Sequence, residues 1–155
     1  MDQNSLSNMT PEKALISSRI MWAALLGGQV IFLIVIIAMQ GRLSGTPDPQ
    51  MVATLHYISI GMVIAAVPVG MFIRSQMYKK FWVGNKVTPQ GYLQGNLLLW
   101  AMCEGTSLFG LVVTMLADGF WPWVVPSALA MAVQVMNWPD GAPMRPAEPQ
   151  LPRRE

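Results

Sequence analysis

Four long apolar stretches dominate the chain, and polar or charged residues separate them. A helix needs about 20 apolar residues to cross the roughly 30 Å of hydrocarbon in a bilayer. Because lipid offers no hydrogen-bond partners, a segment that spans a membrane must satisfy its own backbone groups, as a helix does. The pattern therefore predicts an all-α protein, a bundle of four transmembrane helices, with spans at about 20–39, 51–73, 93–116 and 120–136.

Two threonine–proline pairs indicate where the first and third helices begin. Thr10 precedes Pro11, and Thr88 precedes Pro89. Threonine is a favoured N-cap, and proline suits the first helical turn because an N–H there would have no partner in the helix. The first apolar stretch lacks the small-residue cleavage site of a signal peptide. We therefore expect the first helix to begin near Pro11, in water, and to continue into an uncleaved first span.

Composition divides the chain into three parts. Residues 1–10 are mostly polar and are expected to be flexible, and residues 11–138 form the membrane domain. Residues 139–155 carry a proline at every third or fourth position. Proline lacks a backbone donor and clashes with the preceding turn of a helix, so this segment should build neither a helix nor a core. We predict that it is a disordered C-terminal tail.

The basic residues lie almost entirely on one side of the four predicted spans. Cytoplasmic loops of membrane proteins are enriched in lysine and arginine. We therefore predict that both termini and the loop between spans two and three face the cytoplasm. Nine of the ten basic residues, all except Arg42, agree with this orientation: Lys13, Arg19, Arg74, Lys79, Lys80, Lys86, Arg145, Arg153 and Arg154.

The loop between spans two and three mixes basic and aromatic residues. Its cations are Arg74, Lys79, Lys80 and Lys86. They can be ordinary flanking charges beside aromatic residues at the membrane boundary. Alternatively, they can belong to a short segment that lies on anionic lipid headgroups. Both interpretations make the lipid bilayer a partner of this loop.

Composition also narrows the class of protein. Apolar residues make up 53% of the chain and charged residues 12%, about half the charged share that is usual for soluble proteins. The sequence shows no basic face of the kind that binds nucleic acid. It contains no Ser/His/Asp arrangement, no phosphate-binding glycine loop and no second histidine to complete a metal site. We therefore expect no enzymatic activity, no metal and no cofactor.

Small and polar residues form a stripe along the third span. They recur at alternating steps of four and three residues, which places them on one face of a helix. In lipid, helices associate through close backbone approach and a few polar contacts, and such a face suits this packing. We expect the chain to assemble with itself or with partner membrane proteins through this face. The stripe consists of Asn96, Trp100, Cys103, Ser107, Gly110 and Thr114.

One carboxylate, Glu104, lies near the middle of the third span. An ionised carboxylate at that depth costs about 2.5–3.5 kcal/mol, so an acid inside a membrane indicates function. One interpretation is that this carboxylate binds a proton or cation, with Gln29, Ser107 and His56 as further candidate ligands. The other is that a neutral Glu104 stabilises helix contacts by about 1 kcal/mol. His56 would then be an ordinary interface histidine.

The residues around Glu104 resemble a known family. The stretch AMCEGTSLFGLVV, residues 101–113, is similar to the second helix of the proteolipid (c) subunit of rotary ATP synthases. In that family a mid-membrane carboxylate precedes a Gly-Leu-Val-Val-like run. The resemblance implies that Glu104 is an ion-binding carboxylate. As a whole, the chain resembles small bacterial four-helix membrane proteins, which implies the bacterial inner membrane.

Two functions are compatible with these residues. The first is that of a non-enzymatic assembly or accessory subunit of a membrane complex, whose partners are the bilayer, a second copy or other membrane proteins. The alternative is a component of a proton or cation pathway that uses Glu104 in mid-membrane. The two differ in whether the carboxylate must exchange a proton or only make a contact.

Overall fold

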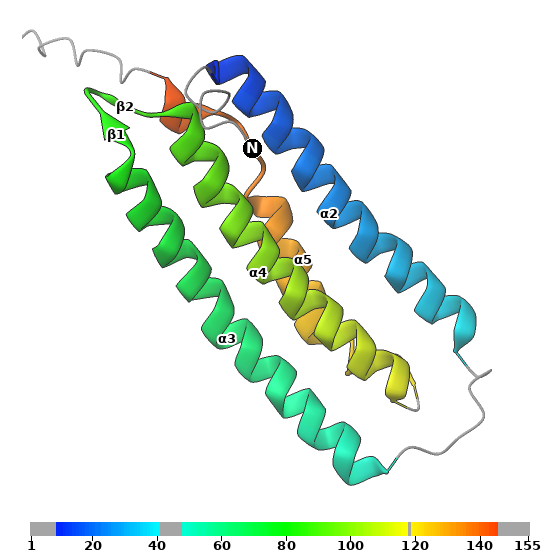
Figure 1. Ribbon diagram of the computed structural model, residues 1–155. Coiled ribbons are helices and arrows are strands. Elements are labelled where there is room, and N and C mark those ends of the chain that lie inside the picture. Colours follow the sequence, from blue (N-terminus) through cyan, green and yellow to red (C-terminus); the bar gives the residue numbers. More distant parts are fainter. Residues whose placement is uncertain (1–8, 41–47, 118, 146–155) are drawn as a thin grey trace, which may run out of the picture.

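The structure is a computed structural model that describes residues 9–40, 48–117 and 119–145. Helices make up most of it (Figure 1). A hairpin of two short strands, β1 (Trp82–Val83) and β2 (Lys86–Val87), joins two of the helices, and a 3₁₀ turn, η1 (Ala142–Met144), follows the last. The predicted all-α class is confirmed. The four α-helices are α2 (Pro11–Met39), α3 (Pro49–Lys80), α4 (Pro89–Leu116) and α5 (Val125–Met136).

Side-chain caps fix where three of these helices begin. Thr10 and Thr88 cap α2 and α4, and each hydroxyl accepts a hydrogen bond from the backbone N–H three residues later at 3.3 Å. The predicted starts at Pro11 and Pro89 are confirmed. Asp48 caps α3 in a similar way, because its carboxylate accepts from a backbone N–H two residues later at 2.9 Å. In each case a proline occupies the first turn, where it removes no helical hydrogen bond.

Helices α2, α3 and α4 are long and apolar enough to cross a membrane, with 29, 32 and 28 residues. Helix α5 has 12 residues, which extend about 18 Å at 1.5 Å per residue, well short of roughly 30 Å of hydrocarbon. The predicted helix over 120–136 is wrong for residues 120–124, which form bends and turns. Proline inside a helix is unfavourable because its ring crowds the carbonyl group four residues earlier, here that of Pro122, and α5 instead begins with Pro126 in its first turn.

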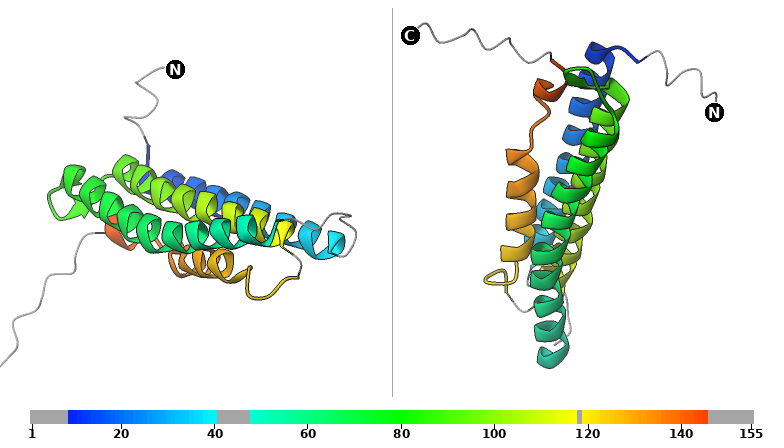
Figure 2. Two further views of the ribbon diagram at one scale, coloured as in Figure 1. Left: turned by 90° about the horizontal axis from the view of Figure 1, so that it is seen from below. Right: turned by 90° about the vertical axis from the view of Figure 1, so that its left-hand side faces the viewer.

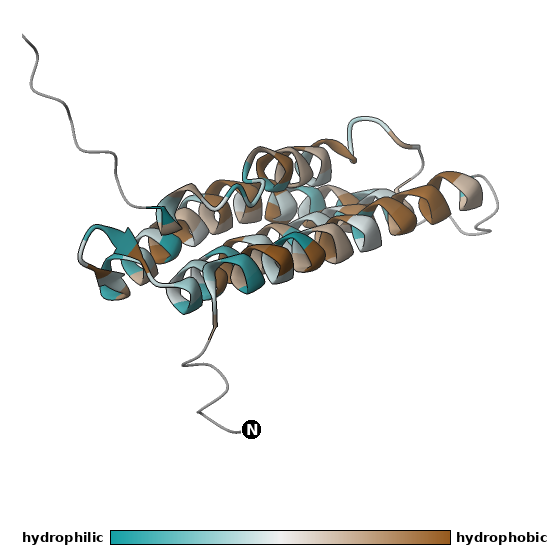
Figure 3. Ribbon diagram, turned by 90° about the horizontal axis from the view of Figure 1, so that it is seen from above, coloured by the Kyte–Doolittle hydropathy of each residue, from teal (hydrophilic) through white to brown (hydrophobic). Residues whose placement is uncertain are grey.

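Helix α4 is the centre of the arrangement. It lies between α2 and α3, and α5 packs along a further side of it (Figure 1, Figure 2). In the most apolar stretch of each helix, half of α4 is buried, against 11% of α2 and 17% of α3. Hydrophobic residues run along the bundle, and hydrophilic residues gather at the end that carries the hairpin and η1 (Figure 3). Most of the apolar surface of α2 and α3 therefore faces outward, as contact with lipid requires.

The segment between spans two and three is more regular than the predicted loop. Residues 74–80 contain neither glycine nor proline, so nothing in them ends the helix, and α3 continues past the apolar run to Lys80. A two-residue turn then joins β1 to β2, and Gly84 supplies the positive φ, 63°, that such a turn favours. The loop is consequently a helix end, a hairpin and the first turn of α4.

Residues 139–145 pack against the bundle, so the predicted disordered tail is wrong for this part. The backbone N–H of Gly141 donates a hydrogen bond to the Tyr92 hydroxyl at 3.1 Å. Proline disfavours an α-helix here, but it does not prevent a short 3₁₀ turn or the burial of a side chain. Residues 1–8 and 146–155, predicted to be flexible and disordered, lie outside the described residues. Residues 139–145 complete a buried apolar cluster through Met144. This cluster, called the end cluster, is made of Ala14, Val87, Tyr92 and Met144.

Candidate functional site

Glu104 lies on α4 at the edge of the buried face and is partly exposed. Its neighbours Ala101 and Gly105 on the same helix are exposed. Within the described part of the chain, the Glu104 carboxylate has no hydrogen bond and no ion pair. A carboxylate on an apolar helix needs a proton, a cation or a polar partner to offset its loss of water. No described residue supplies that compensation.

Gln29 was predicted as a ligand beside Glu104, but it pairs with a different side chain. Its Nε2 donates to Oε1 of Gln134 on α5 at 2.7 Å and to the carbonyl oxygen of Leu25 at 3.2 Å. Both glutamines are fully buried. Trp22 Nε1 also donates to the Gln134 carbonyl oxygen, at 2.8 Å. These bonds tie α2 to α5, so the role of Gln29 in the structure is to join helices.

The other two predicted ligands, Ser107 and His56, form no hydrogen bond with Glu104 among the described residues. The Ser107 hydroxyl and the His56 Nδ1 are both buried and without a hydrogen-bond partner there. The His56 ring stands edge-on to Trp123 with ring centroids 4.9 Å apart. No group of three or more His, Cys, Asp or Glu side chains that could hold a metal ion occurs in the described ranges. Hydrogen bonds therefore do not unite the four candidates into one site.

The stripe on α4 is buried by the chain's own helices. A Cβ atom at Gly110 would collide with Ser127 Oγ, so the absence of a side chain lets α5 approach α4 closely. Ser127 Oγ donates to the Ser107 carbonyl oxygen at 2.9 Å, and Trp100 Nε1 donates to the Asn137 carbonyl oxygen at 3.1 Å. In this structure the stripe therefore offers no free surface to another chain, because the chain's own helices already cover it. The residues buried along it are Asn96, Trp100, Cys103, Ser107, Gly110 and Thr114.

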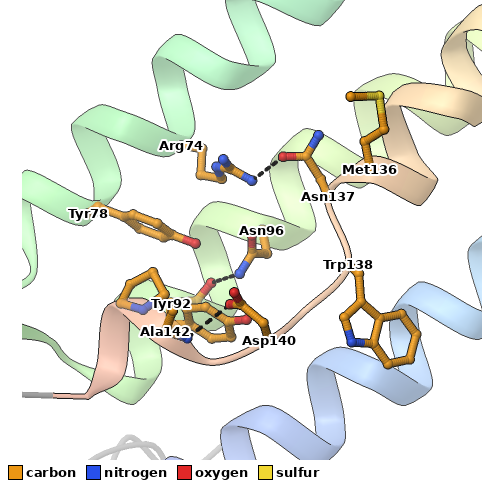
Figure 4. A pocket seen from close by; sticks show the side chains of 10 residues that line it. Arg74, Tyr78, Tyr92, Asn96, Met136, Asn137, Trp138, Asp140 and Ala142 are labelled. Carbon is orange, nitrogen blue, oxygen red and sulfur yellow. Dashed lines mark hydrogen bonds between the residues drawn. The ribbon is translucent and has the colours of Figure 1, made fainter.

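A polar pocket of about 290 Å³ lies at the end of the bundle that carries η1 (Figure 4). Three parts of the chain build it: the last turns of α3, the first turns of α4 and the segment that follows α5. Most of its polar groups are contributed by Arg74, Tyr78, Tyr92, Asn96, Asn137 and Asp140. The pocket thus forms only when the last described segment closes over α3 and α4.

Hydrogen bonds and ring contacts hold these walls in place. Arg74 Nη1 donates to Asn137 Oδ1 at 2.7 Å, and the Arg74 guanidinium lies 5.8 Å from the centre of the Tyr78 ring. Tyr78 stacks on Tyr92 with centroids 6.1 Å apart and an interplanar angle of 18°. Asn96 Nδ2 donates to the Tyr92 carbonyl oxygen at 3.0 Å. The side chains around the pocket are therefore fixed before any ligand arrives.

Arg74 differs from the three lysines that were grouped with it as headgroup contacts. Lys79, Lys80 and Lys86 are exposed, whereas Arg74 is half-buried and lines the pocket. The sequence did not single out Asp140 or its neighbours in the Asn-Trp-Pro-Asp-Gly run. Asp140 accepts a hydrogen bond from the backbone N–H of the second residue after it at 2.9 Å, a turn that an Asp-Gly pair favours. That pair was the one available signal for this wall of the pocket.

Comparison with known proteins finds no matching family model, no similar curated protein and no similar solved structure. The function of this chain therefore has to be inferred from its own residues and their geometry.

Proposed function

We propose that this chain is a non-enzymatic integral membrane protein of a bacterial inner membrane, and that it serves as an assembly or accessory subunit of a membrane complex. Its termini and the hairpin between α3 and α4 face the cytoplasm. The partner helices, from a second copy or another membrane protein, contact α4 along the edge that carries Glu104. The observation that supports this most directly is the partly exposed Glu104 carboxylate with no partner in the described chain.

The distribution of charge supports the orientation. The start of α2, the end of α3, the hairpin and η1 all lie at one end of the bundle (Figure 1). Positive residues on short segments next to spans favour the cytoplasmic side. Every described basic residue belongs to this end: Lys13, Arg19, Arg74, Lys79, Lys80, Lys86 and Arg145.

The short α5 can complete a fourth crossing together with the turns before it. Irregular backbone is tolerated at membrane depth only where protein or water covers it. Helix α5 packs on α4, and residues 120–124 lead into it from the opposite end of the bundle (Figure 2). Trp121 and Trp123 lie in this lead, and aromatic residues prefer the membrane boundary. The chain would then return to the cytoplasmic side at Asn137.

Photo-crosslinking in native membranes tests the partner surface. A photoreactive residue in place of Ala101, which is exposed on the same helix as Glu104, should give a protein adduct. The same residue in place of Ile64 on α3, which is 69% exposed, should react with lipid alone. Glu104→Gln keeps a hydrogen-bonding group and should retain the adduct, whereas Glu104→Leu should lose it. Reaction with lipid alone at both positions would contradict the proposal.

Topology reporters test the orientation independently. Fusions after Gly45, at Asn85 and at the C-terminus should report the outside, the cytoplasm and the cytoplasm, in that order. The physical basis is the excess of lysine and arginine at the Asn85 end. An external signal at Asn85 would reverse the orientation.

A second candidate function is a proton or cation pathway, and it is favoured by the same unpartnered carboxylate. A carboxylate that is buried or faces lipid, and that has no fixed counter-ion, can bind a proton or a cation. The chain reconstituted in vesicles should then carry a proton or sodium flux that Glu104→Gln abolishes, because an amide cannot exchange a proton. Absence of flux with the adduct at Ala101 intact would leave the assembly function and reject the pathway.

A further inference from the structure

The pocket beside η1 lies where the proposed membrane orientation puts the inner headgroup layer. Trp138 lines it, is 48% exposed, and stands edge-on to Trp22 with centroids 4.6 Å apart. The Arg19 guanidinium lies 5.6 Å from the centre of the Trp138 ring. Tryptophan and arginine together are typical of the boundary between hydrocarbon and water. A ligand in this pocket would therefore meet both the lipid headgroups and the cytoplasm.

Arg74 supplies a cation to the pocket, and it forms no ion pair with any described residue. A guanidinium is always charged and carries five N–H donors. In the described ranges, Arg74 donates one hydrogen bond, to the neutral side-chain amide of Asn137, and forms no ion pair. Arginine binds phosphate through two parallel N–H donors, which gives both strength and orientation. The free donors of Arg74 thus fit a phosphate oxygen pair.

Asp140 supplies an anion to the same pocket from a different segment (Figure 4). Its Oδ1 accepts the N–H of Ala142, and the side chain is exposed. It forms no ion pair within the described residues. The second carboxylate oxygen can therefore accept a hydrogen bond from a cation. Opposite charges on separate walls favour a ligand that carries both signs.

We propose that this pocket binds a phosphoethanolamine group, a phosphate ester joined to a primary ammonium, with the phosphate on Arg74 and the ammonium on Asp140. The volume of about 290 Å³ lies just below the roughly 300–1,000 Å³ of sites for drug-sized molecules, which suits a smaller, headgroup-sized ligand. The source of this group is either a membrane lipid or a soluble ester. The proposal goes beyond the assembly function, and only its lipid source rests on the proposed orientation.

The geometry favours a primary ammonium over a quaternary one. Quaternary ammonium sites surround the cation with several aromatic faces. Here Tyr78 and Tyr92 stack on each other, and the Arg74 guanidinium already lies over the Tyr78 ring. A primary ammonium can instead donate hydrogen bonds to the Asp140 carboxylate. Phosphatidylcholine should therefore bind less tightly than phosphatidylethanolamine.

Equilibrium binding to the purified full chain in detergent tests the proposal. The probes are short-chain phosphatidylethanolamine, phosphatidylcholine and phosphatidylglycerol, which share the phosphate and differ in the second charge. Because a hydrogen bond between charged groups contributes to binding, we expect phosphatidylethanolamine to bind about tenfold more tightly than the other two. Asp140→Asn should remove this preference, and Arg74→Gln should weaken the binding of all three about tenfold.

Matched variants separate binding from folding. Asparagine at position 140 keeps an oxygen that can accept the Ala142 N–H, so the turn should survive. Lys79→Gln removes an exposed cation from the same helix as Arg74, outside the pocket, and should leave the binding of all three lipids unchanged. Arg74→Lys keeps the charge but loses the fork, so it should bind less tightly than the parent chain.

Free O-phosphoethanolamine distinguishes the two sources. If it displaces the lipid, the pocket recognises a soluble ester, and if it does not, the pocket requires the lipid; both results support the recognition of phosphate and ammonium together. Equal binding of the three lipids, unchanged by Asp140→Asn, would overturn the proposal. So would equal losses in Arg74→Gln and Lys79→Gln. The adduct at Ala101 is measured separately, so failure here leaves the assembly function standing.

Discussion

Helices α2 and α4 have similar lengths and are both apolar enough to cross a membrane, yet they occupy opposite environments. In its most apolar stretch α2 is 11% buried, whereas α4 is 50% buried. The more buried helix, α4, is the less hydrophobic one: its most apolar stretch has a mean hydropathy of 1.6, against 2.5 for that of α2. Lipid is as apolar as leucine, so hydrophobicity cannot decide which helix lies inside. Small and polar residues decide it, because they allow close approach and interhelical hydrogen bonds.

The largest expected effect tests close approach at Gly110. Gly110→Leu should reduce the free energy of unfolding by about 3 kcal/mol, because the new side chain meets Ser127 on α5. Titration of the detergent-solubilised protein with a denaturing detergent measures this. Gly105→Leu is the matched control, since a Cβ there meets no atom within 4 Å, and its effect should stay under about 0.5 kcal/mol. Equal losses would show that Gly110 is not a contact point.

A smaller effect is expected from removing buried volume. Leu111→Ala on α4 should lower the free energy of unfolding by about 2 kcal/mol, at the low end for a buried leucine because lipid rather than water solvates the unpacked chain. Ile31→Ala on α2 removes the same kind of volume from a side chain that is 65% exposed, and should change it by less than about 0.5 kcal/mol. The same denaturing titration compares them, and a reversed order would contradict the central place of α4.

The hydrogen-bonded glutamine pair between α2 and α5 should contribute less to the free energy of unfolding than the buried Leu111 side chain does. A double-mutant cycle of Gln29→Leu and Gln134→Leu should give an interaction energy of about 1 kcal/mol, typical of polar contacts between membrane helices. Each single variant leaves one buried amide unpaired, so the double variant should be less destabilised than the sum of the two. Strict additivity would mean that the 2.7 Å bond adds no stability.

The smallest effect on folding is expected at Glu104. Because its carboxylate has no hydrogen bond or ion pair in the described chain, Glu104→Gln should change the free energy of unfolding by less than about 0.5 kcal/mol. A loss above 2 kcal/mol would mean that Glu104 stabilises the fold itself, and the need for an outside partner would disappear. Ser107→Ala, on the buried face, is a suitable comparison in the same titration.

Local signals in the sequence predicted helix starts better than helix ends. Thr10 and Thr88 each cap a first turn by bonding a backbone N–H only three residues away, so the helix start can be predicted from the local sequence alone. The end of α3 was predicted where the apolar run stops, but a helix in water needs no apolar residues and continued to Lys80. The shortened α5 follows from the spacing of Pro122 and Pro126, a local signal that the hydropathy of 120–136 obscured.

The partners of polar residues could not be predicted in the same way. Gln29 and Glu104 lie at similar heights in their spans, but height leaves the rotation of each helix open. The structure turns Gln29 toward Gln134 on α5. The pocket could not be predicted for the same reason, because Arg74 and Asp140 line one pocket only once residues 139–145 have packed against the bundle. Such contacts depend on the whole chain, and no short motif encodes them.

The end cluster joins residues that are synthesised early to one that is synthesised late, so it can form only late in synthesis. Ala14, Val87 and Tyr92 leave the ribosome long before Met144, which closes the cluster from the last described segment. Until residues 139–145 are in place, they do not cover the first turns of α2 and α4, and the pocket beside these turns lacks the wall that Asp140 provides. Insertion of the three long helices can therefore precede the closing of this end, so that the pocket forms only after the residues up to Met144 have been synthesised.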